Sequence, residues 1–266
     1  MQILDLLARP DALDEGGLGV LRVAEALGRD KAAVSRALAT LADAGLVDRD
    51  PVRMTYHLGA RLYALAARTQ EAALTQRARP TLRQMVLTVR ETTHLCVLRG
   101  GNVLALLSEV SPQPVGTVGW AGSTTAACRT PSGRVLISDW DRASVDAWYA
   151  RHGHDAALVG LQSSPDPGAF SVLVDPDPAR LVVRDLAGLH TELDRVRSRG
   201  YAVSDEELER GVVAASAPVR DASGSVVAAL NVSAPKNRLG SRLEDLGAYL
   251  ARCGAALSAE LGCPSR

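Results

Sequence analysis

The chain has 266 residues, enough for two ordinary domains, and its 30 basic and 30 acidic residues cancel, which excludes a global basic field that would attract nucleic acid. Its four cysteines are scattered without a Cys-x-x-Cys pair or a histidine at zinc-ligand spacing, so we expect no disulfide scaffold, no metal and no cofactor. Because no apolar run reaches the ~18 residues of a membrane span, we expect a soluble, cytoplasmic protein that binds no membrane.

Two short helices separated by a glycine are predicted near the N-terminus. Gly28 follows the first helix, where a left-handed residue ends a helix at low cost. Asp30 occupies the N-cap position of the second helix, and Gly45 ends it. The apolar residues at helical spacing are Leu21, Val23, Ala24 and Leu27 in the first helix and Ala33, Val34, Ala37, Leu38, Leu41 and Ala42 in the second.

The second helix is predicted to turn a basic and hydroxyl-bearing face to solvent, opposite its apolar stripe. Such a face suits the major groove of DNA. Residues 46–58 then favour two short strands around a charged turn, a wing that would lie beside phosphates. This order is typical of a winged helix-turn-helix, and the predicted DNA-binding residues are Arg29, Lys31, Ala32, Ser35, Arg36, Thr40, Arg49 and Arg53. For any single arginine, an ordinary solvated charge remains an equal alternative.

The local charge limits the DNA affinity of a single winged helix-turn-helix. Residues 29–61 contain six basic and four acidic side chains, a net charge of +2. One copy should therefore bind weakly, and useful affinity should come from paired copies on a roughly palindromic site.

The following segment is rich in helix formers. Residues 60–79 predict a linker helix, and Pro80 is expected to stop it and open a second helix over residues 80–91. Residues 94–98 and 103–107 flank Arg99, Gly100, Gly101 and Asn102, which is a hairpin signal. We therefore predict that the second domain begins as an antiparallel sheet.

The C-terminal half is equally regular. Residues 183–199 predict a helix that Gly200 ends, and residues 202–204 return to extended structure. Residues 212–219 and 226–233 predict two strands around a turn, and residues 239–261 a closing helix. The predicted fold class is α+β, with a winged helix-turn-helix domain at residues 1–60, a linker helix at 61–79 and a second domain at 80–262.

Ordered blocks along the chain resemble the IclR family of bacterial transcriptional regulators. In the first domain they are Asp30-Lys31-Ala32-Ala33-Val34-Ser35-Arg36-Ala37-Leu38, Thr40-Leu41, Gly45 and Tyr56-His57-Leu58-Gly59. In the second domain they are Ser132-Gly133-Arg134-Val135-Leu136, Asp205-Glu206-Glu207, Gly211, residues 215–219, Asp221, Gly224, Val226 and Pro235. The resemblance implies that residues 80–262 form a GAF-like effector-binding and oligomerisation domain. It also implies a homodimer that often pairs into a dimer of dimers, and small organic acids or related metabolites as ligands.

The resemblance also implies a ligand site on the sheet. Its residues would be Thr117, Gly119, Thr130, Pro131, Ser132, Ser204, Ala214, Asn231 and Ser233. A free helix N-terminus near Ser132 would offer amides to an anion. Relatives that bind glyoxylate resemble one another in having an acid and a cysteine where this chain has Ser204 and Ala214, and a small flexible residue where it has Pro131. We therefore expect a larger, partly apolar or aromatic acid, or its amide, to bind better than glyoxylate, although satisfied sheet residues without a ligand remain an alternative.

These observations predict a ligand-responsive DNA-binding regulator, a repressor of a catabolic gene cluster, with double-stranded DNA and a small-molecule effector as partners. The alternative is an enzyme built on the GAF-like domain, with the helical domain serving dimerisation. The adjacent carboxylates of residues 205–209 are more typical of backbone caps or solvated charges than of acid–base catalysis, and Ser132 lacks the flanking pattern of a nucleophile elbow. No catalytic residue is therefore predicted.

Overall fold

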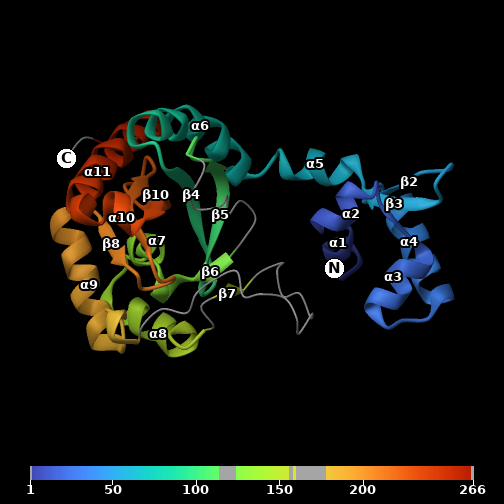
Figure 1. Cartoon of the computed structure of the whole chain (residues 1–266), viewed down its shortest axis with the longest axis horizontal. Coiled ribbons are helices and arrows are strands. Elements are labelled where there is room, and N and C mark those ends of the chain that lie inside the picture. The colour runs from blue at the N-terminus through green and yellow to red at the C-terminus, as the bar shows by residue number, and fades with distance from the viewer. Residues whose placement is uncertain (1, 114–123, 156–157, 160–177, 265–266) are drawn as a thin grey trace. The chain divides into compact units, whose positions relative to one another are not determined.

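The computed structural model describes residues 2–113, 124–155, 158–159 and 178–264. The chain forms two compact units, Met1–Leu74 and Thr75–Arg266 (Figure 1). The division falls inside the segment predicted as the linker, and the roles assigned to residues 1–60, 61–79 and 80–262 remain predictions.

The N-terminal unit combines helices with a small antiparallel sheet. Its elements are α1 (Gln2–Leu7), α2 (Pro10–Asp14), β1 (Leu18–Gly19), α3 (Val20–Leu27), α4 (Lys31–Asp43), β2 (Val47–Arg49), β3 (Thr55–Leu58) and α5 (Ala60–Ala66). The strands lie in the order β1-β3-β2, so β3 is the central strand. The predicted helix-turn-helix and wing are thus confirmed as α3, α4, β2 and β3.

Local chemistry fixes the two predicted helices. Gly28 ends α3 in the left-handed region, at φ 59°, and the Asp30 carboxylate caps α4 by accepting the Ala33 amide at 2.9 Å. Val34 and Leu38 of α4 are buried as predicted. Leu21 and Ala33 were expected to pack inward, but both are exposed, because they lie on the outer sides of their helices.

Helices α1 and α2 and strand β1 were not predicted from the sequence. They complete the core of the unit, in which Ile3, Leu6 and Leu7 pack with Val23 and Leu38. Their short lengths, five and six residues for the helices, give too few turns for a clear helical period. Long-range packing therefore determines these elements.

The segment after the wing differs from the prediction of one helix ending at Pro80. Helix α5 ends at Ala66, and α6 (Gln70–Val89) runs through Pro80. Thr69 causes the break, because its hydroxyl accepts the Ala72 amide at 3.2 Å and so caps α6. The helix tolerates Pro80 because residues on both sides, including Ala78 and Leu82, are fully buried against the second unit's core.

The C-terminal unit is an α+β structure, as predicted. Its strands are β4 (Thr92–Arg99), β5 (Asn102–Glu109), β6 (Thr124–Ala126), β7 (Leu158–Val159), β8 (Ala202–Asp205), β9 (Val212–Arg220) and β10 (Val226–Pro235). Within the described residues they form one seven-stranded antiparallel sheet in the order β7-β6-β5-β4-β10-β9-β8. The predicted hairpin β4–β5 is confirmed, with Arg99 paired to Asn102 around Gly100 and Gly101.

Helices cover both faces of this sheet (Figure 1). Besides α6, the helical elements of the C-terminal unit are η1 (Ala127–Arg129), α7 (Pro131–Leu136), α8 (Arg142–His152), η2 (Pro178–Arg180), α9 (Leu186–Arg199), α10 (Lys236–Leu239), η3 (Gly240–Arg242) and α11 (Leu243–Glu260). Helices α6 and α11 pack on one face, where the Thr93 hydroxyl of β4 donates to the Leu82 carbonyl of α6. Helix α7 packs on the other face, and α8 and α9 extend the core there.

Two predicted helices begin later than expected. Helix α9 begins at Leu186 rather than residue 183, because Asp185 caps it by accepting the Gly188 amide at 2.7 Å. The closing helix begins at Leu243, after the short turns α10 and η3. Both helix ends were close to the prediction, since Gly200 ends α9 at φ 81° and α11 ends at Glu260.

Candidate functional site

The first candidate site is the outer face of α4. Lys31, Ala32, Ser35, Arg36 and Thr40 are all exposed, at successive positions along one side of the helix. On the opposite side Val34 and Leu38 are 1% and 0% exposed. The buried stripe fixes the rotation of α4, and the basic and hydroxyl groups consequently share one solvent-facing surface.

The wing supplies two more of the predicted DNA-binding residues. Strands β2 and β3 pair with Arg49 opposite Tyr56, and the Arg49 guanidinium lies 5.8 Å from the centre of that ring. Asp50 shapes the turn between them by accepting the amides of Val52 and Arg53 at 2.8 and 2.9 Å. These backbone bonds lower the pKa of the Asp50 carboxyl below its usual range.

The remaining predicted DNA-binding residues are exposed but partly engaged within the unit. Arg29 donates to the Gln2 side chain of α1 at 2.7 Å. The Arg53 side chain lies against Gly16, where an added Cβ would come within 2.5 Å of its Nη1. Lys31 and Arg36 on α4 are therefore the cations best placed to contact a ligand outside the fold, and the role of all these residues in DNA binding stays a prediction.

The second candidate site is one face of the large sheet. Ser204 on β8 lies opposite Ala214 on β9, which lies opposite Ser233 on β10. The next row places Ser216 opposite Asn231. Paired residues of antiparallel strands point to the same face, so the structure gathers these five side chains on one surface.

The start of α7 covers this face. Ser132 is 3% exposed, and its Oγ lies 3.1 Å from Ser216 Oγ. Since the Ser216 hydroxyl donates to the Leu230 carbonyl at 2.8 Å, Ser132 is the donor of the pair. Pro131 and Thr130 are also buried beside it. The predicted residues Thr130, Pro131 and Ser132 are thus brought to the same face as the strand residues.

One expectation about α7 was wrong. We expected a free helix N-terminus near Ser132, but the Thr130 hydroxyl accepts the Gly133 amide at 3.1 Å and caps the helix internally. Gly133 also packs on η1 so closely that a Cβ would come within 2.0 Å of the Ala127 carbonyl oxygen. The Gly133 amide is therefore not available to an anion at this site.

Thr117 and Gly119 lie outside the described residues. The other predicted effector-binding residues lie together as stated above. Their contact with an effector stays a prediction.

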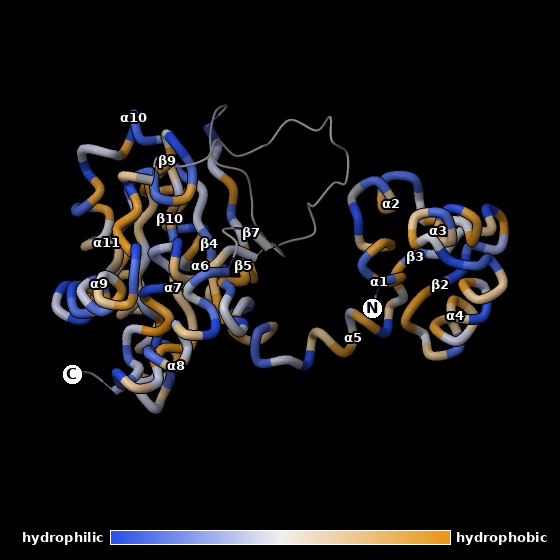
Figure 2. Tube along the Cα trace, turned by 90° about the horizontal axis from the view of Figure 1, so that it is seen from below, coloured by the Kyte–Doolittle hydropathy of each residue, from blue (hydrophilic) through white to orange (hydrophobic). Residues whose placement is uncertain are grey.

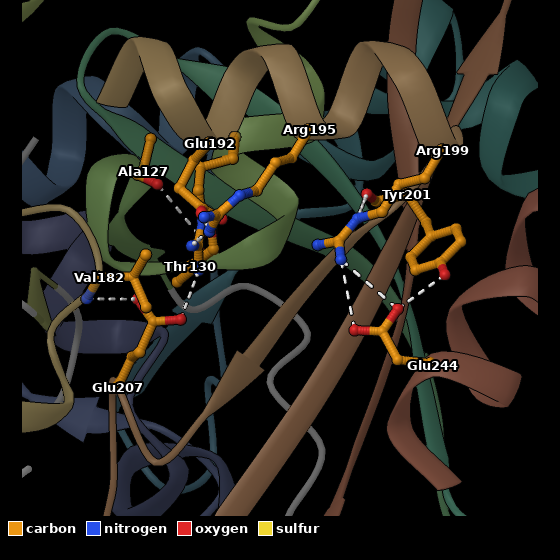
Figure 3. Close-up of polar contacts among 10 residues, drawn as sticks. Ala127, Thr130, Val182, Glu192, Arg195, Arg199, Tyr201, Glu207 and Glu244 are labelled. Carbon is orange, nitrogen blue, oxygen red and sulfur yellow. Dashed lines mark hydrogen bonds and ion pairs between the residues drawn. The ribbon is translucent and has the colours of Figure 1, made fainter. Parts of the chain in front are cut away.

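Sequence reasoning missed a buried cluster of ion pairs that begins on α7 (Figure 3). The Arg134 side chain is 0% exposed and contacts Glu207 Oε1 at 2.8 Å and Glu192 Oε2 at 3.2 Å. Arg195 also binds Glu192, at 2.5 Å. The cluster connects α7 to α9 and to the turn after β8. Arg134 and Glu207 stood in two separate sequence blocks, and nothing in either block indicated that they pair.

The carboxylates of residues 205–207 are consequently structural groups. Lys236 binds Asp205 Oδ1 at 2.7 Å and Glu206 Oε2 at 2.6 Å, while Glu207 pairs with Arg134. The Lys236 ammonium and the Gly211 amide lower the pKa of the Glu206 carboxyl. Within the described ranges, no three His, Cys, Asp or Glu side chains are grouped to hold a metal ion, and no helix there has the length and apolar character needed to cross a membrane.

Comparison with known proteins matches both units. The family profile described as the C-terminal part of bacterial transcriptional regulator IclR matches residues 66–157 and 179–259. The profile of the IclR helix-turn-helix domain matches residues 1–51. Together they cover most of the chain.

Individual relatives agree with these profiles. The chain is 27% identical over 240 residues to the HTH-type transcriptional regulator BhcR of Paracoccus denitrificans, covering 90% of this chain and 77% of that protein. It is 28% identical over 255 residues to the glycerol operon regulatory protein of Streptomyces griseus, covering 93% and 90%. Its fold resembles that of an IclR homologue from Microbacterium hydrocarbonoxydans crystallised with 4-hydroxybenzoate, with a TM-score of 0.75, 19% identity and coverage of 98% and 96%. The chain therefore belongs to the IclR family of bacterial transcriptional regulators.

Proposed function

We propose that this chain is a repressor that reads an operator with the outer face of α4 and senses a small organic acid on the large sheet. The observation that carries the DNA-binding part is the exposure of Lys31, Ser35 and Arg36 on a helix whose opposite side is buried. A helix that presents such a face can enter the major groove, while Arg49 and Arg53 of the wing contact phosphates. The regulated genes would form a catabolic cluster.

The effector is proposed to be a partly apolar or aromatic acid, or its amide, rather than glyoxylate. Ala214 lies between Ser204 and Ser233 in one row across the sheet, so a methyl group separates two hydroxyls. Compact acids need several polar contacts close together, whereas this row alternates polar and apolar groups. Thr117, Gly119, Thr130 and Pro131 would complete the site.

We propose that the functional form is a homodimer, which can pair into a dimer of dimers. Helix α5 has no buried residue, and Tyr63 and Leu65 are 80% and 52% exposed. Figure 2 shows hydrophobic residues along α5. A second copy of the chain could cover them, and two copies would place two α4 helices on one palindromic operator.

We also propose that the chain is not an enzyme. The relatives it matches are named as regulators. The clustered carboxylates of residues 205–207 are held in ion pairs with Lys236 and Arg134, which leaves them structural.

The test is DNA binding by the full chain to the segment upstream of its own gene, measured by mobility shift over a series of salt concentrations. Arg36→Ala should weaken binding by about 1–3 kcal/mol and reduce the salt dependence. Arg142→Ala is the matched control, because Arg142 is an exposed arginine of the second unit. Equal binding by both variants and the wild type would refute the assignment of α4.

A further inference from the structure

A buried histidine lies in the middle of the sheet face described above. His94 on β4 is opposite Asn231 on β10 and opposite Ser108 on β5. It therefore extends the row of Ser216 and Asn231 by two strands. The neighbouring row contains Ser204, Ala214 and Ser233, and Thr92 on β4 lies opposite Ser233. We call the polar residues of the two rows the polar band: Thr92, His94, Ser108, Ser204, Ser216, Asn231 and Ser233.

The His94 ring is held at one nitrogen only. Its Nδ1 lies 2.8 Å from Ser108 Oγ, whereas Nε2 is buried without a hydrogen-bond partner among the described residues. The residue as a whole is 2% exposed. Buried polar atoms are nearly always paired, so an unpaired ring nitrogen in a row of hydroxyls and amides needs an explanation.

The His94 side chain lies on the face of the sheet that α7 covers. Nε2 belongs to the tip of the imidazole, and the bond from Nδ1 to Ser108 keeps the ring over the sheet. The face is the one on which Ser132 of α7 contacts Ser216. His94 therefore projects from the same face of the sheet as Asn231 and Ser204, the residues to which an effector was assigned.

The chemistry of the band favours an oxygen that accepts hydrogen bonds. Burial lowers the pKa of His94 to about 4, so the ring is neutral at physiological pH and carries one proton. The seven residues of the band include no lysine or arginine. With the proton on Nε2, Nδ1 accepts from the Ser108 hydroxyl, and Nε2 can donate to a carboxylate or carbonyl oxygen.

We propose that His94 determines effector specificity by donating a hydrogen bond from Nε2 to a carboxylate or carbonyl oxygen of an organic acid on the polar band. This inference rests on the proposed effector-binding role of the sheet face. It adds a contact from β4, a strand on which the sequence predicted no effector-binding residue.

Two substitutions separate the two ring nitrogens. His94→Asn keeps an amide near the position of Nδ1, where it can still bind Ser108, and removes the donor at Nε2. His94→Gln places an amide nitrogen near the position of Nε2. The matched control is His190→Asn, because His190 binds Asp146 at 2.6 Å between α9 and α8 and belongs to no row of the band.

The experiment is calorimetric titration of the full chain with benzoate, 4-hydroxybenzoate and pyruvate. At least one acid should bind the wild type, His94→Asn should bind it about 10- to 100-fold more weakly, and His94→Gln should recover most of that loss. His190→Asn should bind as the wild type does. Unchanged affinity of His94→Asn would overturn the proposal, and so would failure of all three acids to bind the wild type. DNA binding by the same wild-type preparation tests the proposed function separately.

Nitrogen NMR of the wild type, selectively labelled in its histidines, tests the proposal even where a variant fails to fold. The shift of His94 Nε2 should be that of a protonated ring nitrogen and should move when the acid is added. An unprotonated Nε2 in the complex, or a resonance unaffected by a bound acid, would overturn the proposal.

Discussion

Replacing Arg134 with methionine should destabilise the second unit strongly. The substitution keeps a side chain of similar length but removes the cation shared by Glu192 and Glu207, whose side chains are 4% and 3% exposed. Glu192 would keep Arg195, whereas Glu207 would keep, among the described residues, the Val182 amide at 3.4 Å. Breaking a buried pair in this way costs about 3–5 kcal/mol, because the remaining charge is left uncompensated.

Urea unfolding followed by tryptophan fluorescence measures this cost in the second unit, since all three tryptophans of the chain, Trp120, Trp140 and Trp148, belong to it. With an m-value of about 2 kcal/mol/M, the midpoint should fall by roughly 1.5–2.5 M urea. Protein concentration must be held constant, because oligomerisation contributes to stability. Arg195→Met is the matched control: its side chain is 59% exposed, and its loss should cost less than about 1 kcal/mol. Equal costs for the two variants would refute the reasoning.

Asp30→Ala removes the cap that accepts the Ala33 amide, so α4 should lose about 1 kcal/mol, seen as a lower Tm of the first unit; an unchanged Tm would show that the cap is dispensable. The pKa of His94 is lowered to about 4 from 6.5, so the unfolded chain binds more protons between these values. The contribution of neutral His94 to the free energy of unfolding should therefore be complete above pH 6.5. It should be lost, by about 3 kcal/mol, as the pH falls towards 4. His94→Gln should abolish this part of the slope in urea titrations, and an identical slope in both proteins would contradict it. Burial raises the pKa of Cys96 to about 12 and that of Cys128 to about 11, so neither thiol should react with an aromatic disulfide reagent at pH 8 in the native state; mass spectrometry of the labelled chain checks this.

The parts of the fold that the sequence predicted well are those set by neighbouring residues. Helix α4 has its cap and its terminal glycine within residues 30–45, and both act as expected, as do Val34 and Leu38 of the apolar stripe. The β4–β5 hairpin likewise follows from two glycines between apolar runs. The break before α6 was missed because a proline was given more weight than Thr69, whose hydroxyl supplies the cap.

The parts that could not be predicted depend on which distant segments meet. His94 joins Asn231 only because β4 pairs with β10, and the strand order of the sheet is not visible in a single sequence. Arg134 and Glu207 are 73 residues apart, and their pairing depends on the packing of α7 against the end of β8. Bringing such distant segments together costs conformational entropy, which only the packing of the whole unit offsets, so no local sequence pattern identifies these contacts.

We propose that an acid bound by the second unit changes DNA reading by the first. The most direct test is the affinity of the full chain for 4-hydroxybenzoate, measured with and without a saturating amount of the DNA upstream of its own gene. Linkage requires that DNA change the acid's affinity by the same factor as the acid changes DNA affinity, typically about 5- to 150-fold. We predict a difference of that order between the two titrations. Equal affinity for the acid in the presence and absence of DNA would contradict the claim.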